Sequence, residues 1–270
     1  MILYPHAKIN LGLFVTGKRP DGFHDIETIF YPIALRDILE IHLADGRGQC
    51  LLRCTGEASG PAADNLVARA YRLLSADFPL PSARVHLHKR VPAGAGLGGG
   101  SSDGAFTLKA LDALCDLQLG EARLREYAAR LGSDCPFFIS GQPVVARGRG
   151  EIMSPLDVNL TGRAVVVVKP PRSVSTAGAY RLLPPSPPAR ASLARAVQQP
   201  PERWTGVEND FEKVVAALVP EVREIKERLL AEGALYASMT GSGSAVYGIF
   251  DRPPEARRLF PRYFAWQGLM

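Results

Sequence analysis

The chain has 270 residues, 46% of them hydrophobic, which is enough apolar material for one large core or two modest ones. It contains no run of eighteen apolar residues, and its first residues lack a basic stretch followed by a long apolar one. We therefore expect no membrane-spanning helix, no signal peptide and a cytoplasmic protein. The formal net charge of +5 comes from dispersed basic residues, which argues against a nucleic-acid-binding arm and also suits an anionic small molecule.

Cysteine and histidine usage gives no metal signature. The cysteines are few and scattered, so we interpret them as reduced thiols; they are Cys50, Cys54, Cys115 and Cys135. Cys50 and Cys54 share one face of a predicted strand, but no second pair completes a zinc site. His86 and His88 also share a strand face, and we predict that they are solvated rather than metal-bound.

The first half of the chain mixes predicted strands and helices. Strands are expected at residues 11–15, 37–43, 50–55 and 83–91. Asp64-Asn65 is expected to cap a helix that runs to about residue 78, and further helices are expected at 103–116 and 121–131. Gly132, a residue type favoured just past a helix end, closes the last of these. The predicted inward residues are Leu66, Ala70, Leu73 and Leu74 in the first helix and Phe106, Ala110, Leu111 and Leu114 in the second.

The second half begins with predicted strands at 144–147 and 164–168. Residues 184–188 include four prolines and are expected to form an exposed loop. Helices are expected at 209–218 and 221–232, followed by strands at 235–239 and 245–250. No internal repeat is visible, and we place a domain boundary near residue 155, which divides the chain into domains 1–155 and 156–270.

A glycine-rich segment between a predicted strand and a predicted helix is the most informative part of the chain. It consists of Pro92, Ala93, Gly94, Ala95, Gly96, Leu97, Gly98, Gly99, Gly100, Ser101 and Ser102. A turn of this kind presents unpaired backbone N–H groups at the positive end of a helix dipole, which is a site suited to phosphate. Glycine allows close approach of the phosphate oxygens, and several of these positions are expected to take positive φ.

Three other interpretations of the glycine-rich segment are disfavoured. The lysine-bearing P-loop pattern is absent, because no Gly-Lys-Ser/Thr occurs in the chain. Gly94, Gly96 and Gly99 match the dinucleotide-binding spacing, but no second strand ends in an acidic residue about twenty residues later. A flexible linker is disfavoured because a strand and a helix adjoin the segment directly.

Two more segments complete a family pattern with the glycine-rich one. Ala7-Lys8-Ile9-Asn10-Leu11 lies near the N-terminus, and Thr240-Gly-Ser-Gly-Ser244 lies near the C-terminus. In this order the three segments resemble the three signature motifs of the GHMP kinases. Taken alone, the segment at 240–244 would be read as a simple hairpin turn; the resemblance implies that it lies against the phosphate-binding segment.

The resemblance implies an α+β protein with the two-domain GHMP kinase fold. The N-terminal domain would resemble ribosomal protein S5 domain 2, and the C-terminal domain would be ferredoxin-like. The implied cofactors are ATP and Mg²⁺. The glycine-rich segment would hold the phosphates of ATP, with a hydroxyl of Ser101 or Ser102 near phosphate or Mg²⁺. The sequence does not identify the metal ligands.

One branch of the family matches most specifically. Lys8-Ile-Asn-Leu-Gly-Leu, Asp21-Gly-Phe-His24 and Gly132-Ser-Asp-Cys-Pro-Phe-Phe138 resemble the motifs of kinases that act on a cytidine-diphosphate-linked methylerythritol. These kinases usually carry tyrosine where Phe23 stands, so a hydroxyl is lost and a ring is kept. Val174-Ser-Thr176 with Tyr180, and Asn209-Asp-Phe-Glu212, also fit this branch.

The resemblance assigns roles that the residue patterns alone do not. Asp134 would be the catalytic base, although by itself an aspartate after Gly-Ser is typical of a turn. Lys8, otherwise typical of a surface lysine, would pair with Asp134 and keep it ionised, or would lower the pKa of the acceptor hydroxyl directly. Phe23 and Tyr180 would offer faces to a cytosine ring, and the remaining substrate-binding residues would be Asn10, His24 and Thr176.

The implied activity is ATP-dependent phosphorylation of the 2-hydroxyl of that substrate, a step towards isoprenoid precursors. One alternative is a GHMP kinase for another small alcohol, such as homoserine or mevalonate. A second is a non-enzymatic S5-like RNA-binding module, which the basic pI near 9.1 would suit. The expected partner is therefore a small-molecule substrate, with no nucleic acid and no membrane.

Overall fold

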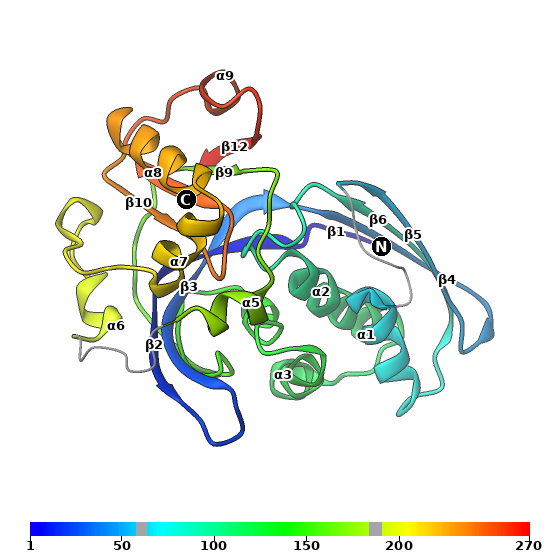
Figure 1. Cartoon of the computed structure of the whole chain (residues 1–270). Coiled ribbons are helices and arrows are strands. Elements are labelled where there is room, and N and C mark those ends of the chain that lie inside the picture. The colour runs from blue at the N-terminus through cyan, green and yellow to red at the C-terminus, as the bar shows by residue number, and fades with distance from the viewer. Residues whose placement is uncertain (58–63, 184–190) are drawn as a thin grey trace. The chain divides into compact units, whose positions relative to one another are not determined.

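The computed structural model describes residues 1–57, 64–183 and 191–270 (Figure 1). These residues form two compact units, each built from separate stretches of chain. Unit 1 comprises Met1–Ala7, Arg36–Ala93 and Gly98–Gln142; unit 2 comprises Lys8–Leu35, Gly94–Leu97 and Pro143–Met270. The proline-rich loop predicted at 184–188 lies outside the described residues. None of the helices in the described ranges is both long enough and apolar enough to cross a membrane.

Unit 1 contains a four-stranded sheet in the order β1-β4-β6-β5. Its strands are β1 (Ile2–Leu3), β4 (Ile38–Arg47), β5 (Cys50–Gly56) and β6 (Pro81–Lys89). The β1–β4 and β4–β6 pairs are antiparallel, whereas β5 pairs with β6 in parallel. A parallel pair needs a crossover connection, and helix α1 (Leu66–Ser75) provides part of it. The strands predicted at 37–43, 50–55 and 83–91 are thus confirmed to within a few residues.

The helices of unit 1 pack together on one face of this sheet (Figure 1). They are α1, α2 (Gly99–Leu114), α3 (Gly120–Leu131) and α4 (Phe137–Ser140). The predicted cap of α1 is confirmed, because Asn65 Oδ1 accepts the backbone N–H of Val67 at 2.9 Å. Its predicted inward face is right at Ala70 and Leu74. The other fully buried residues of α1 are Val67, Ala68 and Tyr71, whereas Leu66 and Leu73 are only half-buried.

Helix α2 differs from its prediction at both its start and its buried face. It begins at Gly99, four residues before the predicted start, and its Ser102 N–H donates to Gly98 O at 2.9 Å. Ala110 and Leu111 are buried as predicted, but Phe106 and Leu114 are only half-buried. The helix is covered on several sides by α1, α3, α4 and β4, so its buried surface is wider than one apolar stripe.

Helix α3 ends where predicted, but Gly132 does not have the backbone conformation that the prediction assumed. Gly132 caps the helix, and its N–H donates to Ala128 O at 3.2 Å. Its φ of 171° is extended backbone, which any residue adopts, rather than the left-handed conformation that favours glycine after a helix.

Unit 2 contains an antiparallel sheet in the order β10-β11-β9-β12. Its strands are β9 (Ala164–Lys169), β10 (Tyr236–Met239), β11 (Val246–Phe250) and β12 (Phe264–Leu269). Helices α7 (Asp210–Leu218) and α8 (Glu221–Ala231) precede β10 in the chain, and α8 packs on β10 and β11. Crossing the sheet from β10 to β12, one meets the second, third, first and fourth of these strands in chain order, and both longer connections contain helices. This is the order of a ferredoxin-like sandwich, as expected.

A second sheet of unit 2 has the order β2-β3-β7-β8. Its strands are β2 (His6–Lys18), β3 (His24–Arg36), β7 (Val144–Gly148) and β8 (Ile152–Pro155); the first residues of β2 and the last of β3 belong to unit 1. The strand predicted at 11–15 is the middle of β2, whereas β3 and β8 were not predicted. The remaining short elements are α5 (Thr176–Arg181), α6 (Leu193–Ala196), η2 (Pro201–Arg203) and α9 (Ala256–Leu259).

Candidate active site

The glycine-rich segment has the backbone that its sequence predicts. Gly94, Gly96 and Gly98 have φ values of +62°, +77° and +71°, so the expected positive φ angles are confirmed. Gly98 is the N-cap of α2, and having no side chain it makes no capping bond. Because the first helical bond starts at Ser102, the N–H groups of Gly99, Gly100 and Ser101 have no acceptor within the helix. The start of α2 is therefore suited to bind an anion.

The turn at 240–244 is both a hairpin and a neighbour of the glycine-rich segment. It joins β10 to β11, with Met239 opposite Val246. Within unit 2, the Ala245 N–H donates to Ala95 O at 3.2 Å, and Gly96 O lies 3.2 Å from Thr240 Oγ1 as one of two acceptors that share its hydroxyl proton. The approach is close, because a Cβ on Gly96 would lie 2.1 Å from Thr240 O. The contact that the family resemblance implied is thus present.

Lys8 is not an ordinary surface lysine, because its side chain is only 3% exposed. Its Nζ donates to Asn10 Oδ1 at 2.6 Å and lies 4.9 Å from the centre of the Phe30 ring. Its backbone N–H donates to Leu97 O at 3.0 Å, which joins β2 to the glycine-rich segment. Unit 2 therefore holds a buried ammonium group whose own residue is hydrogen-bonded to the glycine-rich segment, the predicted phosphate site.

Asn10 orients the Lys8 ammonium through a network of buried hydrogen bonds. Besides the bond from Lys8, Asn10 Oδ1 accepts from Thr240 Oγ1 at 3.1 Å, and Asn10 Nδ2 donates to Thr28 Oγ1 at 2.8 Å. The Asn10 backbone N–H donates to Thr240 Oγ1 at 3.0 Å. These bonds join β2 to a turn 230 residues later in the chain. A substrate contact by Asn10 stays a prediction; the observed contacts give its amide a positioning role.

The motif at 209–212 is hydrogen-bonded to the same turn at 240–244. Asn209 Nδ2 donates to Met239 O at 2.8 Å and to Gly241 O at 2.9 Å, while its Oδ1 accepts the Phe211 N–H and starts α7. The next motif residue, Asp210, accepts the Val15 N–H at 2.8 Å. This segment therefore fixes the turn that holds Asn10.

Asp134 lies in unit 1, in the turn between α3 and α4, where it is half-buried. Its carbonyl accepts the Phe137 N–H at 3.3 Å. The adjacent Cys135 is fully buried, and burial raises the pKa of its thiol to about 12. Cys135 is thus a neutral thiol at physiological pH, and the role of Asp134 as catalytic base stays a prediction. Its pairing with Lys8 stays a prediction.

The aromatic residues predicted to bind the substrate lie in unit 2. The rings of His24 and Tyr180 are stacked, with centroids 4.8 Å apart and planes 20° apart. That separation is direct ring contact, so no base lies between these two rings. The Phe211 ring meets Tyr180 edge-on, also at 4.8 Å. Phe23 is 54% exposed, with the Arg149 guanidinium 4.6 Å from its ring centre.

Thr176, the last predicted substrate residue, is the first residue of α5. Its Oγ1 lies 2.8 Å from Ser242 Oγ, so it contacts the turn at 240–244. The structure thus brings the predicted residues Lys8, Asn10 and Thr176 to the surroundings of one turn in unit 2.

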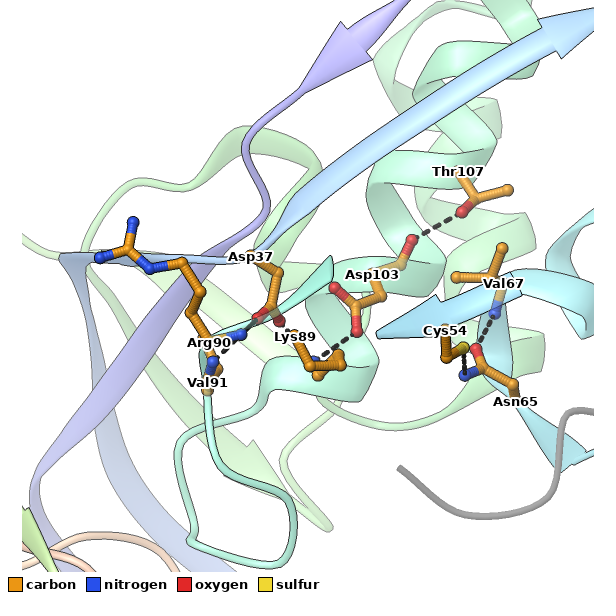
Figure 2. Close-up of polar contacts among 9 residues, drawn as sticks. All are labelled: Asp37, Cys54, Asn65, Val67, Lys89, Arg90, Val91, Asp103 and Thr107. Atoms are coloured by element: carbon orange, nitrogen blue, oxygen red, sulfur yellow. Dashed lines mark hydrogen bonds and ion pairs between the residues drawn. The ribbon is translucent and has the colours of Figure 1, made fainter. Parts of the chain in front are cut away.

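Sequence reasoning missed a buried charged cluster in unit 1, formed by Asp37, Lys89 and Asp103 (Figure 2). Lys89 Nζ donates to a carboxylate oxygen of Asp37 and to Asp103 Oδ2, the latter at 2.6 Å. Burial raises the pKa of Asp103 and outweighs the opposing effect of Lys89, as expected where one ammonium faces two carboxylates. The available signal was the position of two residues in the chain, since Lys89 lies three residues before the glycine-rich segment and Asp103 directly follows it.

Two family models match the chain. The GHMP kinases N terminal domain matches residues 65–142, and the GHMP kinases C terminal domain matches residues 191–264. The predicted boundary near residue 155 falls between the two matches but stays a prediction.

Named relatives match over nearly the whole chain. A Bacteroides fragilis protein named 4-diphosphocytidyl-2-C-methyl-D-erythritol kinase is 46% identical, over 99% of this chain and 98% of that protein. A Parabacteroides distasonis protein of the same name is 43% identical, over 99% of each.

Solved structures agree with these matches. A crystal structure of 4-(cytidine 5'-diphospho)-2C-methyl-D-erythritol kinase has a TM-score of 0.83 and 35% identity, over 99% of this chain and 98% of that one. The Methanococcus jannaschii mevalonate kinase, at 13% identity and a TM-score of 0.71 over 100% and 98% of the two chains, shows the shared fold. The expected α+β class and two-domain GHMP kinase fold are confirmed. The chain belongs to the GHMP kinase family and, within it, to the group of the 4-diphosphocytidyl-2-C-methyl-D-erythritol kinases.

Proposed function

We propose that this kinase transfers the γ-phosphoryl group of ATP to the 2-hydroxyl of 4-diphosphocytidyl-2-C-methyl-D-erythritol. The observation that carries the proposal is the buried Lys8, whose backbone is bonded to the glycine-rich segment and whose ammonium is oriented by Asn10. Phosphoryl transfer depends mainly on positioning and charge neutralisation, and this arrangement supplies both. The names of the relatives support the choice of acceptor.

Each step of the transfer has a proposed residue in this chain. The backbone of residues 92–102 binds the phosphates of ATP, with the N–H groups at the start of α2 as donors. Asp134 accepts the proton of the acceptor hydroxyl as the oxygen–phosphorus bond forms. The bond between the γ-phosphorus and the bridging oxygen breaks, and ADP leaves. Lys8 stabilises negative charge on the acceptor oxygen or keeps Asp134 ionised.

The chain also offers an oxygen donor that fits Mg²⁺. Among the described residues, Ser102 Oγ is fully buried at the first turn of α2 and has no hydrogen-bond partner. Mg²⁺ prefers oxygen ligands and is usually shared between substrate phosphates and one or two protein groups. We propose that Ser102, with Ser101 beside it, holds the ion, which would supply charge neutralisation on the phosphates when bound. Within the described ranges, no three His, Cys, Asp or Glu side chains are grouped as a metal site.

Thr240→Val is expected to lower kcat about ten-fold, because it removes the hydroxyl that holds Asn10 and through it Lys8. The KM for the acceptor should rise by less than kcat falls, since Thr240 is fully buried and affects the acceptor only through Asn10. Steady-state kinetics would measure both constants. Thr240→Ser keeps the hydroxyl and should restore kcat. If the valine variant were as active as the parent protein, the positioning role of Thr240 would be disproved.

Recognition of the cytidine end is assigned to Phe23, His24 and Tyr180, with Thr176 and Asn10 as further predicted contacts. Tyr180→Ala is expected to weaken acceptor binding about 10–100-fold, since stacking on a ring contributes about 1–3 kcal/mol per base. The affinity for ATP should hardly change. Tyr180→Phe keeps the ring and serves as the control, and calorimetric titration would measure both ligands.

The acceptor itself gives a second test of the cytidine pocket. Methylerythritol phosphate, which lacks cytidine, should be a very poor acceptor, because binding energy from the remote base also positions the reacting hydroxyl. If this truncated compound were phosphorylated as well as the full one, the assignment of a cytidine pocket would be wrong.

One assay tests the proposed function as a whole. ADP release would be followed with a coupled assay across the cytidine-linked acceptor, homoserine and mevalonate. Activity confined to the cytidine-linked compound supports the proposal, whereas a preference for either other alcohol overturns it. Salt-sensitive RNA binding without ATP turnover would instead favour the S5-like RNA-binding alternative. A cytoplasmic location stays a prediction.

A further inference from the structure

The charged cluster of Asp37, Lys89 and Asp103 has no role in the mechanism above, yet it adjoins both ends of the glycine-rich segment. Lys89 is the last residue of β6, Asp37 lies between β3 and β4, and Asp103 is in the second turn of α2 (Figure 2). All three are at most 5% exposed. Both ion pairs of the cluster are made by the same Lys89 ammonium group.

Asp37 fixes the upstream end of the segment. Its Oδ1 accepts the backbone N–H of Arg90 at 2.6 Å and that of Val91 at 2.8 Å. These are the last two residues before Pro92. The backbone N–H of Asp37 in turn donates to Pro5 O at 2.9 Å. This bond fixes the backbone of the residue that carries the carboxylate.

Lys89 connects this end to the helix that follows the segment. The same ammonium that bonds to Asp37 also bonds to Asp103 in α2. The two ends are packed closely, because a Cβ on Gly99 would lie 2.8 Å from Val91 Cγ1 and 3.2 Å from Lys89 Nζ. Gly99 is one of the residues whose N–H has no acceptor within the helix. The position of this N–H depends directly on the packing of Gly99 against Val91 and Lys89.

Burying one cation with two carboxylates costs free energy that apolar residues of similar size would not cost. Among the described residues, Asp103 Oδ1 also has no hydrogen-bond partner, which adds to that cost. Such a cluster is a poor source of stability but a good means of fixing one geometry, since each bond is directional and charged.

We propose that Asp37, Lys89 and Asp103 are positioning residues for ATP, which hold the two ends of the glycine-rich segment at the spacing needed for its N–H groups to bind phosphate. The proposal rests on the proposed nucleotide-binding role of that segment. It assigns these residues no contact with ATP.

The test uses two variants that each leave the cluster with one cation and one carboxylate. Asp37→Ala and Asp103→Ala each remove one carboxylate and leave Lys89 paired with the other. We expect either variant to raise the Kd for ADP about ten-fold, measured by calorimetric titration of the full chain, because a charged tether to one end of the segment is lost. The KM for ATP should rise in parallel, and the KM for the acceptor should stay unchanged.

Asp112→Ala is the matched control, because Asp112 also uses a carboxylate to accept a backbone N–H, that of Leu119, but at the far end of α2. It should lower the Tm without changing the Kd for ADP. If the two alanine variants lowered the Tm in the same way and left the Kd for ADP unchanged, the cluster would be merely structural and the proposal overturned.

If an alanine variant did not fold, Asp37→Asn or Asp103→Asn would replace it in the test. A smaller rise in the Kd for ADP is then expected, and an unchanged Kd would overturn the proposal. Failure of the parent protein itself to bind ADP would overturn the proposed function instead.

Discussion

Asp134→Asn is expected to lower kcat about 10²–10⁴-fold, the usual cost of losing a positioned general base. The amide keeps the shape of the side chain but cannot accept the proton of the acceptor hydroxyl. The backbone bond from Phe137 to the Asp134 carbonyl does not involve the side chain, so the turn should persist. Steady-state kinetics with the cytidine-linked acceptor would measure the loss, and circular dichroism would check the fold.

Lys8→Met provides the companion measurement. The methionine fills the same buried volume without the ammonium, and Asn10 Oδ1 keeps its bond from Thr240. A loss of kcat comparable to that of Asp134→Asn is expected, because both residues act on the charge that develops at the acceptor oxygen. Near-normal kcat in a folded Asp134→Asn variant would show that the base has been assigned to the wrong residue.

Local sequence patterns predicted the elements whose signals are local. The cap at Asn65, the strands β4, β5 and β6 of the unit 1 sheet and the β10–β11 hairpin all follow from capping residues, alternation and turn residues that lie within a few positions. The long strand β3 was missed because its sequence, HDIETIFYPIALR, has an irregular pattern and carries a proline.

The early start of α2 shows where propensity misleads. Gly99 and Gly100 are poor helix formers, so the pattern favoured a later start. Close packing explains glycine at two positions of α2. Gly99 lies against Val91, and a Cβ on Gly104 would lie 3.0 Å from Leu66 Cβ. Tertiary contacts thus select glycine at positions where helix propensity alone would exclude it.

The site was predictable as a set of motifs but not as a network. The family pattern identified Lys8 and Asn10 as site residues. The hydrogen bonds from Asn10 to Thr240 join residues 230 positions apart, and hydrophobic periodicity within a segment does not predict contacts at such a separation. Asp37 and Lys89 are likewise 52 residues apart. Buried polar groups need partners, but the sequence does not say which distant group provides them.

Gly96→Ala is expected to raise the KM for ATP about ten-fold or more and to destabilise the fold by about 1–3 kcal/mol. Gly96 has a φ of +77°, and its added Cβ would lie 2.1 Å from Thr240 O and 2.9 Å from Thr240 C. Both are backbone atoms, so neither can rotate away. The glycine-rich segment and the turn at 240–244 would have to separate, which removes the Thr240–Gly96 bond and displaces Asn10 with it.

Gly162→Ala separates the effect of this collision from that of backbone strain. Gly162 also has a positive φ, +86°, but a Cβ there would meet nothing within 4 Å. Its alanine variant should therefore show the strain alone, as a small fall in Tm with an unchanged KM for ATP. Thermal unfolding and ATP kinetics of the two variants would be compared. Equal effects of the two substitutions on the KM for ATP would mean that the contact between Gly96 and Thr240 does not shape the nucleotide site, because strain would then account for the whole change.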